Sequence, residues 1–338
     1  MNSPKVAIVI LNWNGQKYLE QFLPSVFNTD YPNLEIIVGD NDSTDESLNY
    51  LNDHYPLVKV IRNEKNFGFA EGYNKVLSQV DADYFILLNS DVEVTPNWIQ
   101  PVIDLMETDE QIAIAQPKIK SFLRRSHFEY AGAAGCFIDY LAYPFCRGRI
   151  FDTVEEDKGQ YDGNKEIFWA AGCALFIKSS VWKRVNGLDE NFFAHMEEID
   201  LCWRVKNLGY KVMYCGASTI YHVGGGTLNA ESPFKTYLNF RNNHYLIKKN
   251  IEPKRANFLI PLRFCLDLLA LLKFASEGKW KNAMAISKAH QHVIKALWDK
   301  KIKYNKDISA QPNLTGMYQQ SIVWKYFVNG KRKFSELD

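Results

Sequence analysis

The sequence lacks the paired cysteines that a zinc ribbon or a disulfide framework requires. Its six cysteines are scattered, with no CxxC pair, at positions 136, 146, 173, 202, 215 and 265. Such pairs are typical of structural zinc sites, and small secreted domains carry cysteines more densely. We therefore expect reduced thiols and a cytoplasmic protein.

The sequence also lacks a long, uninterrupted apolar run. The apolar stretch at residues 258–275 is interrupted by Arg263, Asp267 and Lys273. A membrane-spanning helix needs about 20 apolar residues, so none is expected here. The first apolar run of the sequence, which follows Lys5, is short and has no cleavage site of small residues. We therefore interpret it as a buried strand rather than a signal peptide.

A strong net charge is absent as well. The chain has 40 Lys+Arg against 39 Asp+Glu, a formal net charge of +1, which argues against a nucleic-acid binder. The distribution is uneven, because residues 241–338 hold 19 Lys+Arg against 7 Asp+Glu, whereas residues 1–240 hold 21 against 32. The acidic first part of the chain is suited to binding a cation and polar ligands, and the basic C-terminal part is suited to contact with an anionic surface.

The first part of the chain alternates between strand and helix patterns. Apolar, β-rich runs occur at residues 6–11, 34–39, 58–62 and 84–88, and helix patterns occur at 16–26 and 70–80. This order favours an α/β fold with a mostly parallel, Rossmann-like sheet flanked by helices. Polar residues recur just past the strands, at the carboxyl edge where open α/β sheets bind ligands.

The rest of the chain departs from this pattern. Residues 112–162 are irregular, and we interpret them as loops over the site. A strand at 173–178, a helix at 196–206 and a strand at 211–214 follow. Residues 246–338 are Lys-rich, Leu-rich and helical, which predicts a helical, basic C-terminal region.

The segment Gly39–Ser47 (GDNDSTDES) places hydrogen-bond acceptors directly after a buried strand. The carboxylate of Asp40 can accept hydrogen bonds from a base N–H or a ribose hydroxyl. Ser43 and Thr44 can cap the next helix, so capping alone remains the alternative.

The segment Asn66–Asn74 (NFGFAEGYN) places Asn66 and Gly68 where a loop becomes a helix. A glycine there lets the backbone approach a phosphate or a ribose closely. A purely structural turn is the alternative.

The segment Leu87–Glu93 (LLNSDVE) delivers Asn89 and Asp91 to the edge of the sheet, two residues apart. A hard divalent cation prefers oxygen ligands and keeps waters and substrate phosphates, so one carboxylate can suffice. A simple turn acid is the alternative.

The segment His195–Arg204 concentrates three acids at the start of a helix. Asp200 can pair with Arg204 four residues on, and acids in a first turn favour the helix dipole. Two adjacent glutamates, Glu197 and Glu198, point to different sides of the helix. One of them can therefore face a pocket and act as a general base.

His222 precedes a run of glycines in a loop expected at residues 221–227. It is either a hydrogen-bonded core residue or a ligand for a metal or a diphosphate. Downstream, Arg241 and Asn242 supply either a cationic clamp on phosphate or a pair on a helix face.

Taken together and in order, these phrases resemble the family 2 glycosyltransferases of the GT-A fold, in the bacterial rhamnosyltransferase-like branch. The similarity covers about residues 4–245 through VAIVILNWNG, DNDSTDES, NFGFAEGYN, LLNSDVE, AAGCALFIK, GLDENFFAHMEEIDLCWR and HVGGG. It implies a nucleotide-sugar-binding catalytic domain over residues 1–245, with residues 246–338 as an extension.

The resemblance implies inverting transfer of a sugar to a hydroxyl of a glycan or a lipid-linked acceptor in cell-surface polysaccharide synthesis. The donor would be linked to dTDP or UDP, and the branch suggests rhamnose. A sugar nucleotidyltransferase is the competing interpretation, but it would prefer a Gly-rich basic loop where Asn12-Trp13-Asn14-Gly15 stands. A catalytically silent sugar-binding protein is a third.

The resemblance also implies roles for single residues. Asp91 would end a DxD-like motif that holds Mg²⁺ or Mn²⁺ on the diphosphate, with help from His222. Glu197 and Glu198 match the family's acidic pair, with the base at Glu198. The nucleotide-sugar-binding residues would be Asn12, Asp40, Asn66, Gly68, Asn89, Asp91 and Arg241.

Two positions depart from the family pattern. Asn89 stands where many relatives have the first Asp of the metal motif, and Glu198 stands where Asp is more usual. The interpretation requires Asp91 and the glutamate pair to converge on one cleft although more than a hundred residues separate them.

The segment 260–274 (IPLRFCLDLLALLKF) predicts an amphipathic helix. With the basic residues Lys248, Lys249, Lys254 and Arg255 it could rest on anionic lipid at the inner face of the cell membrane. The alternatives are a buried packing helix and a contact in a homodimer.

Overall fold

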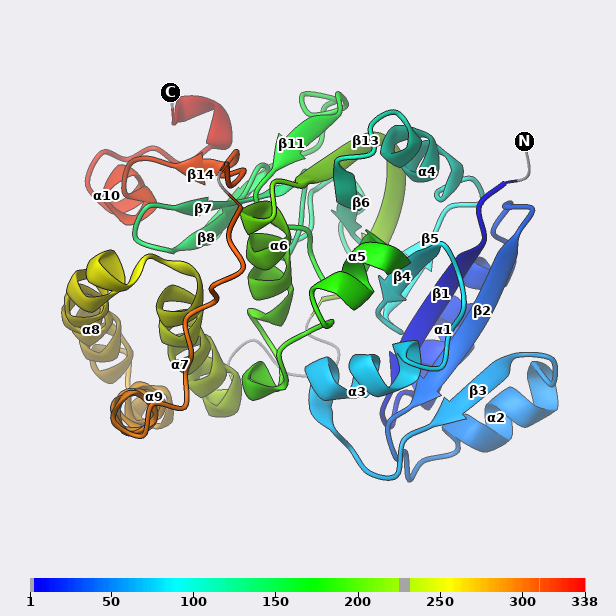
Figure 1. Cartoon of the computed structure of the whole chain (residues 1–338), viewed down its shortest axis with the longest axis horizontal. Helices are drawn as coiled ribbons and strands as arrows, with labels where there is room; N and C mark the ends of the chain where they lie inside the picture. Colours follow the sequence, from blue (N-terminus) through cyan, green and yellow to red (C-terminus); the bar gives the residue numbers. More distant parts are fainter. Residues whose placement is uncertain (1–2, 225–231, 310, 338) are drawn as a thin grey trace.

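The computed structural model describes residues 3–224, 232–309 and 311–337, and a nine-stranded sheet forms its centre (Figure 1). The strand order is β11-β13-β6-β12-β4-β1-β2-β3, and β5 pairs with β13 beside this path. The strands are β1 (Val6–Asn12), β2 (Leu34–Asp40), β3 (Lys59–Arg62), β4 (Tyr84–Leu88), β5 (Val92–Val94), β6 (Ile112–Ser121), β11 (Lys165–Ile167), β12 (Ala174–Lys178) and β13 (Lys211–His222).

Most strands of this sheet point in one direction. The strands β3, β2, β1 and β4 are parallel neighbours. Because β12 runs antiparallel to both β4 and β6, the parallel pair β6 and β13 points the same way as β1 to β4. The predicted α/β fold with a mostly parallel sheet is confirmed.

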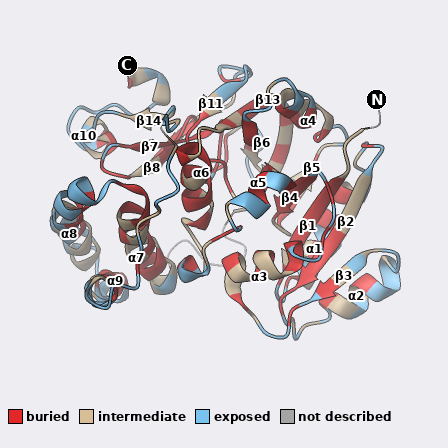
Figure 2. Ribbon diagram, viewed as in Figure 1, coloured by how far each residue is buried: buried red, intermediate tan, exposed pale blue. Residues whose placement is uncertain are grey.

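Helices cover the central strands, and the strands β1 and β4 are almost wholly buried (Figure 2). Both faces of such a sheet must be apolar, which is why these strands are continuous Val/Ile/Leu runs rather than alternating ones. The helices before the C-terminal region are α1 (Gln16–Phe27), α2 (Ser47–His54), α3 (Gly68–Leu77), α4 (Gln100–Glu107), α5 (Ser179–Arg184) and α6 (Glu197–Asn207).

The expectation of loops over residues 112–162 holds only in part, because strands occupy much of this region. Residues 112–121 form β6, whose first eight residues are buried in the central sheet. Its strand pattern is obscured because Gln116 and Lys118 are polar yet buried, Gln116 donating to the Gly132 carbonyl and Lys118 pairing with Asp157. A second sheet follows, made of β7 (Cys136–Asp139), β8 (Pro144–Cys146), β9 (Arg149–Ile150), β10 (Thr153–Val154) and the late strand β14 (Met317–Tyr318).

The strand expected at 211–214 is longer than the sequence suggested. β13 continues through an irregularity between Cys215 and Thr219 and ends only at His222. The loop expected at 221–227 therefore begins later, and its residues 225–227 lie outside the described ones.

The C-terminal region is helical, as predicted. It contains α7 (Pro233–Asn250), α8 (Pro253–Ser276), α9 (Trp280–Trp298) and α10 (Ile322–Phe327). Helix α7 crosses residue 245, and β14 pairs with β7 of the second sheet. One continuous apolar core includes residues on both sides of 245, and the division into 1–245 and 246–338 stays a prediction.

Two buried aspartates join the C-terminal helices. Asp200 on α6 accepts hydrogen bonds from Arg204 at 2.8 Å, as the sequence predicted, and from Lys249 at 2.9 Å and Asn250 at 2.8 Å on α7. Asp267 on α8 contacts His244 of α7 at 2.9 Å and His290 of α9 at 3.2 Å.

Within the described ranges, no helix is apolar over a length that could cross a bilayer.

Candidate functional site

A cavity of about 2550 Å³ runs along the carboxyl edge of the sheet and on to the C-terminal helices. Cavities for single small ligands measure roughly 300–1,000 Å³, so this one has room for two substrates. Its strand end is lined by Trp13, Asn14, Asn41, Asn66, Gly68, Asn89 and Asp91. Its apolar end is lined by Leu262, Leu266, Leu269, Phe274, Trp324 and Phe327.

Asn12 and Asp40 lie behind the strand end rather than in its lining. Both are fully buried, and the Asn12 amide donates to the Ser43 hydroxyl at 3.1 Å while Asp40 accepts from the Ser43 amide at 3.1 Å. Asn14, two residues after Asn12, accepts from the Thr44 amide at 2.7 Å. The two predicted residues thus hold together the loops after β1 and β2, whose tips face the cavity.

Asn66 and Gly68 lie at the start of α3, as predicted, and line the cavity. Asn66 accepts from the Gly68 amide at 2.8 Å and from Asn41 at 3.0 Å. Gly68 has a φ of 74°, and a Cβ there would lie 2.6 Å from the Phe193 ring. Only glycine therefore lets α3 start against the turn that carries Phe193. Asn41, which sequence reasoning passed over in favour of Asp40, is the residue that connects these loops.

Asp91 and His222 lie side by side because β5 pairs with the end of β13. His222 is opposite Val92 in that antiparallel pair, and its Nε2 lies 3.2 Å from Asp91 Oδ1. On the other side, His222 Nδ1 lies 3.6 Å from Glu129 Oε2, an ion-pair distance that is too long for a hydrogen bond. Burial opposes a charge on His222, but the Glu129 and Asp91 carboxylates raise its pKa to about 10.

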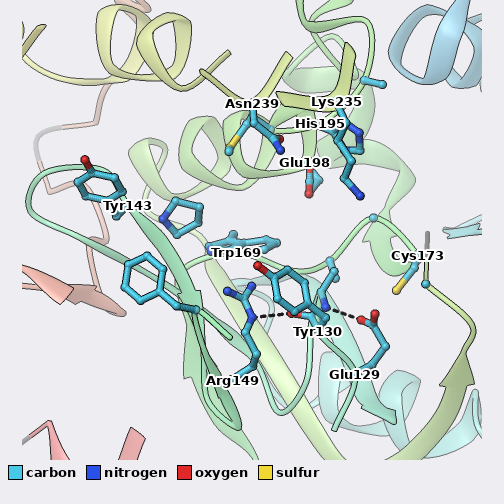
Figure 3. A pocket seen from close by; sticks show the side chains of 18 of the residues that line it. Glu129, Tyr130, Tyr143, Arg149, Trp169, Cys173, His195, Glu198, Lys235 and Asn239 are labelled. Atoms are coloured by element: carbon cyan, nitrogen blue, oxygen red, sulfur yellow. Dashed lines mark hydrogen bonds between the residues drawn. The ribbon is translucent and has the colours of Figure 1, made fainter. Parts of the chain in front are cut away.

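Glu129 was missed by sequence reasoning. It lies in the segment expected to be loop, and its amide donates to the Ile119 carbonyl of β6 at 3.0 Å. The side chain is buried and lies beside His222. Figure 3 shows it in the lining of the cavity. No motif in the sequence marks it, because β6 brings it to the site from a distance.

The glutamate pair begins α6, directly after a strained turn. Phe193, His195 and Met196 all have positive φ, at 66°, 68° and 76°. Non-glycine residues adopt this conformation at a cost of about 1–3 kcal/mol each, and such strain gathers at functional sites. The turn lets Glu197 and Glu198 both line the cavity, where Figure 3 shows Glu198 directed inward.

Both glutamates titrate above their ordinary range. Burial and the adjacent Glu198 hold the pKa of Glu197 well above its usual value. Burial raises the pKa of Glu198 to about 7. One carboxylate oxygen of each, Oε2, is buried with no hydrogen-bond partner in the described part of the chain. An unpaired carboxylate that accepts a proton near neutral pH is suited to general-base work.

Arg241 and Asn242 hold the strained turn from behind. The Asn242 amide donates to the carbonyls of Phe192 at 3.0 Å, Ala194 at 2.9 Å and His195 at 2.6 Å. Arg241 donates to the carbonyls of Asn191 at 3.1 Å and Phe192 at 2.8 Å and does not line the cavity. The structure therefore brings Asp91, His222, Glu197 and Glu198 to one cavity and leaves Arg241 outside it.

Several lining residues between Glu198 and the apolar end carry no sequence signal. Figure 3 shows Arg149, Tyr130 and Trp169 on one side of the cavity and Lys235 and Asn239 of α7 on the other. Arg149 and Tyr130 belong to the segment expected to be loop. Their positions depend on the second sheet, which local sequence pattern did not reveal.

One group of potential metal ligands lies away from the cavity. Ligand atoms of His244, Asp267 and His290 lie within 4.8 Å of one another, and none of the three residues lines the cavity. Both imidazoles already contact one carboxylate oxygen of Asp267. We interpret this group as a link between α7, α8 and α9.

A family model described as Glycosyl transferase family 2 matches residues 7–184. An uncharacterized glycosyltransferase of Haemophilus influenzae is 32% identical over 114 residues, which are 33% of this chain and 35% of that protein. The N-acetylglucosaminyl-diphospho-decaprenol L-rhamnosyltransferase of Mycobacterium tuberculosis is 22% identical over 240 residues, 64% of this chain and 75% of that protein.

Among solved structures, GalNAc-T7 with UDP, GalNAc and Mn²⁺ has a similar fold, with a TM-score of 0.58 and 18% identity. The likeness covers 75% of this chain and 49% of that one. The chain thus spans about half of GalNAc-T7 and about a third of the Haemophilus relative. The likeness to GalNAc-T7 agrees with the α/β architecture described above.

We predict that Asn242→Ala loosens the turn before α6, because three carbonyls lose their shared donor. Amide hydrogen exchange of residues 191–199 should accelerate. The matched control is Asn243→Ala, since Asn243 is also buried but donates to the Ala142 carbonyl at 2.7 Å. That variant should change exchange near residue 142 instead. Equal exchange of the turn in both variants would contradict the assignment.

Proposed function

The chain belongs to glycosyl transferase family 2. We propose that it is a glycosyltransferase that uses a nucleotide-sugar donor, and that it inverts the anomeric centre as it transfers the sugar to a hydroxyl of a glycan or a lipid-linked acceptor. The observation that carries this proposal is the single cavity that Asp91, His222 and Glu198 share. A base and a site for the leaving group face the same space there.

Glu198 is the base of the proposed reaction. A sugar hydroxyl is a poor nucleophile, so its proton must leave as the bond to the anomeric carbon forms. The raised pKa of Glu198 matches this task near neutral pH. Attack in line with the leaving group inverts the anomeric centre without a covalent glycosyl-enzyme, so one carboxylate is sufficient. Burial and the adjacent Glu198 raise the pKa of Glu197, which disfavours a negative charge on both carboxylates at once.

Asp91 and His222 form the proposed site for Mg²⁺ or Mn²⁺. Their nearest ligand atoms are 3.2 Å apart, so one ion would contact both if it displaced the proton that His222 otherwise holds. Carboxylate and imidazole ligands suit Mn²⁺, and a buried pair of carboxylates around one histidine is a set that a cation neutralises. Glu129 would orient His222 from its other ring nitrogen. The ion would neutralise charge on the diphosphate as it leaves, and the remaining ligands would be donor oxygens and water.

The strand end is the proposed site of the nucleotide. Asn14, Asn41, Asn66 and Gly68 line it with amide groups that can contact a base or a ribose. Asp40 and Asn12 support these loops from behind, so their contribution to donor binding would be indirect. The proposed donor is a dTDP- or UDP-linked sugar. The similarity of the chain to the mycobacterial L-rhamnosyltransferase supports rhamnose as the transferred sugar and a role in cell-surface polysaccharide synthesis.

The apolar end is the proposed contact with a membrane surface. Large apolar side chains are exposed on α8 and α10, among them Leu268, Leu269, Leu272, Trp324 and Phe327. Basic residues lie with them around the cavity, including Lys273, Lys279 and Lys325. This combination suits anionic lipid, to which each basic residue near the surface adds about 1 kcal/mol. The protein would then be peripheral on the inner face of the cell membrane.

We predict that Glu198→Gln lowers kcat by about 10²–10⁴, the usual worth of a general base, with donor affinity nearly unchanged. Release of nucleoside diphosphate from a panel of UDP- and dTDP-sugars measures this. The wild-type rate should rise with pH through about 7, because Glu198 must lose its proton first, and then level off. Glu190→Gln, an exposed glutamate that does not line the cavity, is the control. If Glu198→Gln turns over at the wild-type rate, Glu198 is not the base.

A second prediction concerns the metal site. Asp91→Asn should weaken donor binding that depends on Mn²⁺, since a neutral amide is a poorer ligand than a carboxylate. Thermal shift with each nucleotide sugar, with Mn²⁺ or with EDTA, gives the metal-dependent part. Asp53→Asn, at an exposed position on α2, should keep the full Mn²⁺ effect. If Asp91→Asn keeps it too, the ion binds elsewhere.

A third prediction tests the membrane surface by flotation of the intact chain with liposomes. Vesicles rich in phosphatidylglycerol should carry the protein, less so at high salt, and phosphatidylcholine vesicles should not. The double variant Leu269→Gln, Trp324→Gln should not float with the vesicles, because it lacks two apolar side chains that would contact the lipid. Leu57→Gln, at a leucine that is 97% exposed outside this surface, should float. Equal recovery of both variants, or a dimer without flotation, would refute the contact.

A further inference from the structure

Two cysteines face each other across the hairpin of β7 and β8. Cys136 and Cys146 are directly opposite in this antiparallel pair, and their sulfur atoms lie 3.4 Å apart as free thiols. Because the Arg147 amide donates to the Gly135 carbonyl at 2.9 Å, the adjacent pair of cysteines is a non-hydrogen-bonded pair. The Cα atoms of such a pair lie about 4.5 Å apart, within the range of about 4.4–6.8 Å that disulfides span. The hairpin can therefore accept a disulfide with little movement of its strands.

A buried guanidinium is directed at one of the two sulfur atoms. Arg149 of β9 is only 8% exposed, and its Nη2 lies 3.6 Å from Cys146 Sγ. A neutral thiol is a weak hydrogen-bond acceptor, so a buried charge beside it is costly unless the sulfur atom carries a negative charge. Burial opposes a charge on Cys146, but a hydrogen bond from Cys136 and the charge of Arg149 lower the pKa of its thiol. Arg149 and the Cys146 thiolate therefore balance each other.

The two thiols of the pair differ in reactivity. Burial raises the pKa of Cys136 well above its usual value, opposite to the direction for Cys146. Burial also raises the pKa of the other buried cysteines, Cys173, Cys202 and Cys215. The thiolate is the form of cysteine that attacks an oxidant, whereas a buried thiol with a raised pKa is inert. Cys146 is therefore the attacking member of the pair, and Cys136 is the thiol that can resolve the product.

The pair lies directly behind the wall of the cavity. Arg149, which contacts Cys146, lines the cavity, and Figure 3 shows it there. On the other side of the pair, Cys136 forms an isolated bridge with Trp169, which also lines the cavity. One layer of side chains separates the sulfur atoms from the cavity, so an oxidant must be close to the size of water to reach them.

We propose that Cys136 and Cys146 are a redox-active dithiol, which hydrogen peroxide oxidises to a disulfide across the hairpin. The Cys146 thiolate attacks one oxygen of the peroxide and the O–O bond breaks. The departing hydroxide takes up a proton to become water, and Cys146 is left as a sulfenic acid. The Cys136 sulfur then attacks the Cys146 sulfur, the S–O bond breaks, and the Cys136 proton leaves with the hydroxide as a second water. The two thiols thus lose two electrons and two protons, and the peroxide is reduced to two waters.

The disulfide would change the cavity through Arg149. In the reduced protein the Cys146 thiolate balances the guanidinium, and in the disulfide this negative charge is absent. The wall that contains Arg149 would then be more positive. The oxidation does not depend on the glycosyl transfer proposed above, so its test needs no sugar substrate.

Mass spectrometry of the intact, reduced chain after exposure to hydrogen peroxide tests the proposal. The protein is then denatured, labelled with N-ethylmaleimide and digested with trypsin. Both cysteines lie in one tryptic peptide, residues 126–147. The disulfide therefore appears as an unlabelled peptide that is lighter by two hydrogens. Cys173, Cys202 and Cys215 are buried free thiols and serve as controls in the same digest.

The wild-type peptide should become the disulfide at a peroxide dose that leaves the three control cysteines labelled, and dithiothreitol should restore both labels. The variant Cys136→Ser should stop at the sulfenic acid, which dimedone traps on Cys146, because no thiol resolves it.

The rate of oxidation tests the role of Arg149. Arg149→Gln should slow it about tenfold or more, because the thiolate fraction falls about tenfold for each unit by which the pKa rises. Arg149→Lys keeps the charge and should be intermediate, and it decides the outcome if Arg149→Gln does not fold. Arg184→Gln is the matched control, because Arg184 also stacks on a tyrosine, Tyr210, but lies outside the cavity. It should oxidise at the wild-type rate.

Three results would overturn the proposal. If peptide 126–147 stays a dithiol while a control cysteine is oxidised, the pair is not redox-active. If dimedone does not label Cys146 in Cys136→Ser, Cys146 is not the attacking thiol. If folded Arg149→Gln is oxidised at the wild-type rate, Arg149 does not stabilise the thiolate.

Discussion

The turn at residues 191–196 is the constraint on which the site depends. It has three positive φ angles at non-glycine residues, and hydrogen bonds from two distant helices hold it in place. The Phe69 amide of α3 donates to the Phe193 carbonyl at 2.8 Å, and Asn242 of α7 donates to three carbonyls of the turn. The strain at the turn is thus offset by contacts from both parts of the chain, and the glutamate pair is aimed at the cavity.

The charges in the cavity are arranged in opposite sets along its length. Near the strand end, Asp91 and Glu129 surround His222, a group that suits a cation and, with it, a diphosphate. Farther along, Arg149 and Lys235 line the wall, which suits an anion without a metal. Glu198 lies in the same cavity as both sets. This arrangement supports the proposal that the donor and the acceptor occupy different parts of one cavity, because each set attracts a ligand that the other does not.

Much of the first part of the fold could be predicted because its elements are locally consistent. The buried runs that became β1, β2 and β4 are continuous and apolar, and Asn66, Asp91 and Glu198 lie next to such elements in the chain. The region from Ile112 to Asp162 could not be predicted in the same way. Gln116 and Lys118 are polar in a buried strand, and their partners, Gly132 and Asp157, are distant in sequence. Glu129 and Arg149 were missed for the same reason.

The sequence by itself determined the order of strands and helices, the polar residues at the strand ends and the glutamates at the start of α6, because these follow from local periodicity and from neighbours in the chain. Only the tertiary structure decided that β5 pairs with the end of β13 and so places Asp91 beside His222. It also decided that Asn242 and Arg241 support the turn from outside the cavity, and that Arg149 is buried without a carboxylate partner in the described part of the chain. Hydrogen bonds and charge balance between residues far apart in sequence depend on packing, which no local pattern encodes.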